Sequence, residues 1–143
     1  MRSQMVGAVM LSNSRGTQAI DRSTWSRYLS LYKSKIRPLQ RYGDLYHVLP
    51  RPNALDWDGL FYVDADAESS TKGVLMIFKP SKQAGNTQNV KLRGLEADVT
   101  YNVVFQDHTD LNCSMTGAQL MNDGLDVTFT ENLASDWVWI EAK

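Results

Sequence analysis

The sequence predicts a mainly β fold: an antiparallel two-sheet β-sandwich of about eight strands, preceded by a short strand and one amphipathic α-helix. Three observations predict it. Apolar and polar residues alternate over much of the chain after residue 44, as they do in strands with one buried face. Turn-forming residues separate these runs at short intervals, which is typical of sandwiches. Helical periodicity is confined to one segment near the start.

The first segment, residues 5–11, is uniformly apolar and is followed by a polar stretch at 12–16. This pattern predicts a strand that is buried on both faces. The run is far shorter than the roughly 20 residues that span a bilayer, and no clean signal-peptide cleavage site follows it. We therefore expect a soluble protein with no membrane partner, and favour a cytoplasmic location.

Residues 21–36 are expected to form the helix. Apolar side chains recur there at spacings of three and four, which places them on one stripe of a helix. Pro38 follows this segment and is expected to end the helix. If the stripe is not covered by the rest of the chain, it is the expected partner-binding face. Its residues are Trp25, Tyr28, Leu29, Tyr32 and Ile36.

The remaining chain divides into two kinds of predicted strand. Period-two alternation marks residues 90–92, 99–105, 111–115 and 125–129. Residues 45–49, 73–78 and 137–140 are apolar throughout, which predicts central or covered strands. The alternation places Cys113 on a core-facing side. We expect two parts: an amino-terminal strand and helix over 1–40, and the sandwich over 41–143.

Composition excludes several classes of function. The formal net charge of the 143 residues is −1, which gives no overall field to attract nucleic acid. A single cysteine and two histidines without ligand spacing leave no metal site, and no nucleotide-binding motif is present, so no cofactor is expected. The candidate acid pairs lie in or beside turns, where carboxylates are usually solvated, so no catalytic residue is assigned.

Aromatic side chains are the other feature with functional potential. Exposed Trp and Tyr rings stack on sugar rings while their neighbours supply hydrogen bonds. The candidate sugar-stacking residues are Trp57, Tyr62 and Tyr46. Trp137 and Trp139 share one face of a strand whose other face is also apolar, so burial explains them more simply.

The order and spacing of many short segments resemble the α-galactosidase-like (melibiase-type) glycoside hydrolases. These segments are 31–39 (LYKSKIRPL), 43–52 (GDLYHVLPRP), 57–59 (WDG), 73–80 (GVLMIFKP), 92–95 (LRGL) and 116–121 (TGAQLM). Members of that family carry two catalytic Asp residues on a (β/α)₈ barrel, which is followed by an antiparallel C-terminal sandwich. Segment 7–13 (GAVMLSN) is similar to the last strand of the barrel, and the helix of residues 25–36 is similar to its last helix.

The resemblance implies a non-catalytic C-terminal domain, because nothing in the chain matches the segments that bear the catalytic carboxylates. Such a domain would pack against a catalytic barrel absent from this chain, or would self-associate through the amino-terminal helix. Two explanations of that helix stay open: the chain is a fragment of a longer enzyme, or the helix covers the sandwich. A stand-alone carbohydrate-binding module is the alternative function. A hydrolase in its own right is not expected.

Overall fold

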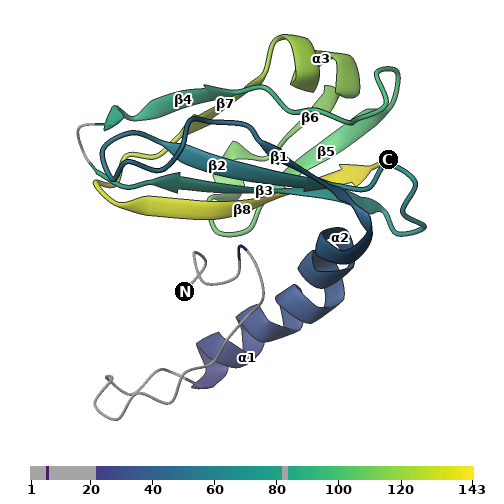
Figure 1. Ribbon diagram of the computed structural model, residues 1–143, viewed down its shortest axis with the longest axis horizontal. Helices are drawn as coiled ribbons and strands as arrows, with labels where there is room; N and C mark the ends of the chain where they lie inside the picture. The colour runs from purple at the N-terminus through teal and green to yellow at the C-terminus, as the bar shows by residue number, and fades with distance from the viewer. Residues whose placement is uncertain (1–5, 7–21, 82–83) are drawn as a thin grey trace.

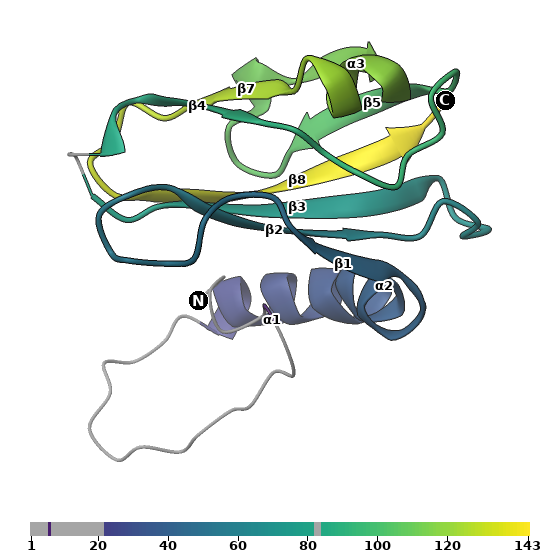
Figure 2. The ribbon, with the colours of Figure 1, turned by 45° about the horizontal axis from the view of Figure 1, so that its top comes forward.

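The computed structural model describes residue 6, residues 22–81 and residues 84–143. Over these residues the strands form two antiparallel sheets, one of six strands and one of two, which confirms the predicted antiparallel sandwich. Figure 2 shows three layers in succession: the small sheet, the large sheet, and the helix that lies beneath the large sheet. Figure 1 shows the two longest strands, β3 and β8, running side by side in the large sheet.

The large sheet has the strand order β1-β2-β3-β8-β5-β6. Its two longest strands, β3 and β8, are central and pair along their length, with Met76 opposite Trp137. Both were predicted as strands with two apolar faces, and their middle residues are buried on both faces. The bounds are β1 Asp44–His47, β2 Asp58–Val63, β3 Thr71–Lys79, β5 Thr100–Phe105, β6 Cys113–Thr116 and β8 Ala134–Ala142.

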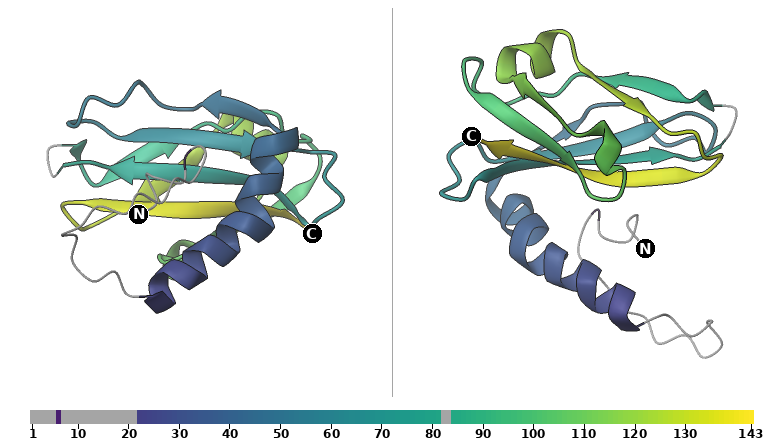
Figure 3. Two further views of the ribbon diagram at one scale, coloured as in Figure 1. Left: turned by 60° about the horizontal axis from the view of Figure 1, so that its bottom comes forward. Right: turned by 180° about the vertical axis from the view of Figure 1, so that it is seen from behind.

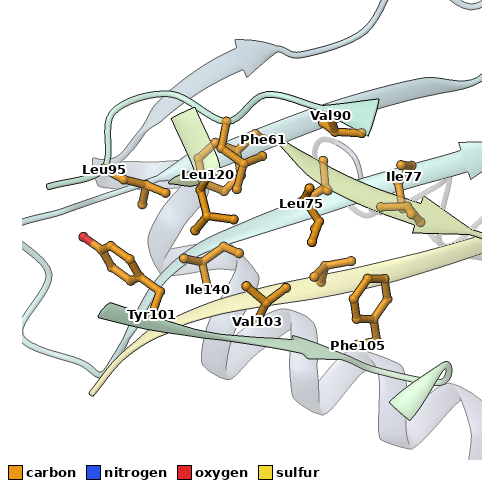
Figure 4. Close-up of a cluster of buried hydrophobic side chains, with 14 of the residues drawn as sticks. Phe61, Leu75, Ile77, Val90, Leu95, Tyr101, Val103, Phe105, Leu120 and Ile140 are labelled. Atoms are coloured by element: carbon orange, nitrogen blue, oxygen red, sulfur yellow. The ribbon is translucent and has the colours of Figure 1, made fainter. Parts of the chain in front are cut away.

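The small sheet pairs β4 (Thr87–Val90) with β7 (Leu125–Thr128) and covers the inner face of the large sheet. Alternation in β7 is as predicted: Leu125 and Val127 are buried and the two residues between and after them are exposed. The short helix α3 (Gly117–Asn122) closes this layer, and Leu120 projects from it into the core. Figure 4 shows Phe61, Leu75 and Val103 of the large sheet pointing toward Val90 and Leu120.

The amino-terminal helix is longer than predicted. It comprises α1 (Arg22–Leu31), a π-helical turn η2 (Tyr32–Ile36) and α2 (Arg37–Tyr42), so Pro38 does not end it. A proline within a helix lacks the amide donor and crowds the carbonyl four residues earlier. The wider turn just before Pro38 accommodates this, because the Arg37 amide donates to the Tyr32 carbonyl five residues back.

The helix crosses the outer face of the large sheet obliquely (Figure 3, left). Ile36 and Leu39 are buried there against Tyr62, Val74 and the two tryptophans of β8. The structure therefore contains one of the two arrangements considered for this helix: its apolar stripe covers the sandwich. The division of the chain at residues 40 and 41 stays a prediction, although the helix itself continues to Tyr42.

Three of the predicted strands are more exposed than expected or lie outside the described residues. The predicted strand 45–49 is a short edge strand, β1, whose residues are exposed or half-buried, because it pairs only with β2. Cys113 is exposed, so its assignment to the core was wrong: β6 is also an edge strand and lies beyond the cover of the small sheet. The strand predicted over residues 5–11 lies outside the described residues, apart from Val6.

Candidate functional site

A pocket of about 800 Å³ lies at one corner of the large sheet, which we call the corner pocket. β1 and β3 end there, and β2 and β8 begin there. No residue of the helical stripe is among the described lining residues, although Phe78 of the lining packs against the same outer cluster as the stripe (Figure 3, left). The lining residues are Val6, His47, Pro50, Pro52, Asp58, Gly59, Leu60, Phe78, Lys79, Pro80, His108, Glu131, Leu133, Ala134 and Ser135.

A partly buried aromatic ring, Phe78, packs on the outer cluster and lies between two polar residues in this pocket. Strand register places Asp58 of β2 directly opposite Phe78 on one side and Ser135 of β8 opposite it on the other. Partial burial raises the pKa of the Asp58 carboxyl above its usual value, because desolvation penalises its charged form. The Asp58 carboxylate has no hydrogen-bond or ion-pair partner among the described residues.

His108 also lines the pocket and is hydrogen-bonded to a buried carboxylate. Asp136 is fully buried, and its Oδ2 lies 2.8 Å from His108 Nδ1. The same carboxylate accepts hydrogen bonds from the amides of Asp107, His108 and Trp137 at 2.8–3.3 Å. Because an ionised carboxylate only accepts hydrogen bonds, it places the proton of a neutral His108 ring on Nδ1. His108 Nε2 lies 3.6 Å from Glu131 Oε1.

The pocket's lysine is directed into the sandwich. Lys79 is 2% exposed, and its ammonium donates to Asn86 Oδ1 and to the Phe129 carbonyl, each at 2.8 Å. Both acceptors are neutral. This ammonium is therefore bonded within the sandwich, beside the small sheet. The other ionisable side chains among the described lining residues are Asp58, His47, His108 and Glu131.

Two of the three predicted sugar-stacking residues, Trp57 and Tyr62, are buried in the core. Trp57 is 3% exposed, stacks on Phe129 with ring centroids 5.3 Å apart, and donates its indole N–H to the Ala84 carbonyl. Tyr62 is 8% exposed, and its hydroxyl donates to the Val6 carbonyl. Tyr46 is half-buried and packs on the inner core, so its role stays a prediction. The aromatic that sequence reasoning missed is Phe78, since only strand pairing reveals its polar neighbours.

The predicted partner-binding face of the helix is turned toward its own sheet. Ile36 is fully buried, and Trp25, Tyr28, Leu29 and Tyr32 are partly buried against the same cluster. The rest of the helix surface is basic: residues 22–42 contain six Lys or Arg and no acidic residue. At the junction of α2 and β1, Tyr42 is 72% exposed and Leu45 is 45% exposed, and the Arg41 guanidinium lies over the Tyr42 ring. We call Arg41, Tyr42 and Leu45 the junction surface.

In the part of the chain that the structure describes, no three His, Cys, Asp or Glu side chains are grouped so that they could hold a metal ion. Over those same ranges, no helix has the length and apolar character needed to cross a membrane.

Comparison with known proteins gives concordant results. Residues 57–140 match the family model described as the glycosyl hydrolase family 36 C-terminal domain. Alpha-galactosidase C of Emericella nidulans is 34% identical over 110 residues, which cover 76% of this chain and 13% of that protein. The probable alpha-galactosidase C of Aspergillus terreus is 28% identical over 108 residues, which cover 75% of this chain and 13% of that protein.

A solved structure shares the fold. The galactosidase domain of the alpha-galactosidase-sucrose kinase AgaSK superposes with a TM-score of 0.61 and 17% sequence identity, over 88% of this chain and 17% of that one. The chain thus spans 13% of the length of the two curated relatives. The resemblance found in the sequence is confirmed.

Proposed function

Because the chain belongs to the glycosyl hydrolase family 36 C-terminal domain family, we propose that it is a non-catalytic accessory domain that packs against and stabilises the catalytic barrel of an α-galactosidase-like enzyme. The matched relatives are about eight times longer than the segment they share with this chain, and they are an α-galactosidase and a probable α-galactosidase. A domain covalently joined to such a barrel is expected to share an interface with it.

The observation that carries the proposal is the junction surface. Large apolar side chains with exposures of 72% and 45% stand three positions apart at the end of the helix that precedes the sandwich. Contiguous exposed apolar residues mark interaction sites, and aromatic and Arg side chains are enriched in interfaces. The helix's own apolar stripe is occupied by the large sheet, so this surface is the more available one for a barrel or for a second copy of the chain.

The non-catalytic part of the proposal rests on two supports. The matching family model is that of a C-terminal domain. In addition, the carboxylate that is best placed to act with a histidine, Asp136, is fully buried and accepts backbone hydrogen bonds, so its role is structural.

The proposal is tested with a chimera in which this chain replaces the matching region of the Emericella nidulans relative. We expect the chimera to fold and to keep hydrolytic activity, and Tyr42→Ser with Leu45→Ser to lower its melting temperature by several degrees, because an apolar contact is lost. The matched control is Leu133→Ser, which alters a side chain that is also 72% exposed but lines the corner pocket and is not part of the junction surface.

Two outcomes would contradict the proposal. One is a chimera whose melting temperature responds equally to the junction and control substitutions. The other is hydrolysis of a nitrophenyl α-galactoside by the isolated chain, since an accessory domain has no such activity. Sedimentation of the isolated chain separates the self-association alternative, which predicts a dimer that Tyr42→Ser dissociates.

A further inference from the structure

We propose that the corner pocket binds the ring of a neutral sugar, with Phe78 as the stacking platform and with Asp58 and His47 as hydrogen-bond partners. The site differs from the aromatic residues predicted from the sequence, two of which are buried in the core. It does not depend on the accessory role, because the pocket and the junction surface have no residue in common.

The platform is set by strand pairing. Directly opposed residues of an antiparallel pair have Cβ atoms about 4.5–5.5 Å apart. Because Phe78 is opposite Asp58 on one strand and Ser135 on the other, polar groups stand on both sides of a partly buried aromatic ring that also lines the pocket. One face of a pyranose presents C–H groups that stack on such a ring, while its hydroxyls point outward toward flanking polar groups.

The polar partners are available for a ligand. His47 is paired with Leu60, two residues beyond Asp58 on β2, so His47 and Asp58 are diagonal neighbours on one face of the sheet. Among the described residues, neither side chain has a hydrogen-bond partner. An ionised carboxylate accepts hydrogen bonds and a neutral imidazole both donates and accepts. Adjacent sugar hydroxyls, each a donor and an acceptor, complement this pair.

Charge argues against an anionic ligand. The Lys79 ammonium is bonded to Asn86 and Phe129 within the sandwich, whereas the carboxylates of Asp58 and Glu131 line the pocket. A phosphate or carboxylate ligand would be repelled by them. Much of the remaining lining is apolar, with three prolines, Leu60 and Leu133, which suits a ligand with an apolar face. A small organic cation is the competing ligand and is an outcome of the test.

The experiment is a titration of the full chain, labelled with ¹⁵N, with methyl α-galactopyranoside and methyl α-glucopyranoside, followed by amide NMR shifts. We expect shifts centred on His47, Asp58 and Phe78 and a dissociation constant of about 1 mM, the range set by so small a ligand. Asp58→Asn is expected to weaken binding about fivefold, and Phe78→Leu about tenfold, because an aromatic face is lost while the apolar volume is largely kept.

Matched controls are Asp66→Asn, an exposed carboxylate at the other end of β2, and Tyr42→Leu, an exposed aromatic on the junction surface. Both should bind as the unmodified chain does. If Phe78→Leu unfolds the protein, Asp58→Asn still decides. The proposal is overturned if neither glycoside shifts these amides at 50 mM, if all four variants bind alike, or if tetramethylammonium shifts them and the glycosides do not.

Discussion

The ring of Tyr28 stands edge-on against the indole of Trp137, with ring centroids 5.2 Å apart and planes at 82°. The Tyr28 hydroxyl donates to Asp107 Oδ2 at 3.0 Å, beyond the end of β5. One helical side chain thus contacts a central strand and the loop after its neighbour. Because helix and sandwich are joined in this way over α1, they are expected to unfold together.

Replacing Tyr28 with Ala should lower the free energy of unfolding by about 2 kcal/mol, because a partly buried ring and its edge-to-face contact are lost. Tyr42→Ala is the control and should change it by less than about 0.5 kcal/mol, since that ring is 72% exposed. Urea denaturation monitored by tryptophan fluorescence measures both. Equal effects would show that the helix does not dock on the sheet in solution.

The sequence was most informative where one strand has one clearly buried face. In β5, the inward Tyr101, Val103 and Phe105 were predictable from alternation alone, because both neighbouring strands and the small sheet enforce it. Cys113 follows the same alternation, yet it is exposed, because burial also depends on the sheet's edges, which no local pattern specifies. The capping box of Thr116 and Gln119 was a local signal for α3 that the glycines around it obscured.

The candidate site was harder to predict than the fold. Asp58 and Phe78 lie twenty positions apart in sequence and meet only through the pairing of β2 with β3. His108, in the loop after β5, contacts Asp136 of β8, although the two residues are 28 positions apart in the sequence. Register and loop paths are non-local properties, so residue spacing could not have indicated these pairs.

Substituting Asp136 with Asn should destabilise the protein by about 3 kcal/mol. The amide group keeps one acceptor oxygen and presents an N–H₂ group to backbone amides that need an acceptor, so buried donors are left unsatisfied. Asp110→Asn, an exposed change in the adjacent 3₁₀ turn, is the control and should be nearly neutral. Thermal unfolding measures both, and a neutral Asp136→Asn would refute the network's structural role.

Asp58 gives a prediction about pH. Burial raises the pKa of its carboxyl above the usual value of 3.8, so the folded state binds this proton more tightly than the unfolded chain does. Ionisation therefore costs stability as the pH rises from below 3.8 through the folded-state pKa. Asn cannot ionise, so Asp58→Asn should raise the melting temperature at pH 7 relative to the unmodified chain. The gain should shrink as the pH falls toward 3.8.

The control for this pH effect is Asp66→Asn, which changes an exposed carboxylate. Its melting temperature should follow that of the unmodified chain at every pH. An increment for Asp58→Asn that stays constant between pH 7 and pH 3.5 would mean that the desolvated carboxyl is not its cause.

Two glycines with positive φ separate backbone strain from steric overlap. A Cβ on Gly85 (φ +73°) would meet no described residue within 4 Å, whereas a Cβ on Gly124 (φ +89°) would overlap Asn89 Oδ1. Asn89 Nδ2 donates to Asp126 Oδ1 at 2.8 Å and to the Asp123 carbonyl at 3.2 Å, so it cannot move without losing both bonds between β4 and the start of β7.

Gly85→Ala should therefore cost about 1 kcal/mol from backbone conformation alone. Gly124→Ala should cost about 3 kcal/mol by urea denaturation, because it also breaks these bonds. Equal costs would mean that Asn89 does not tie the two strands of the small sheet together.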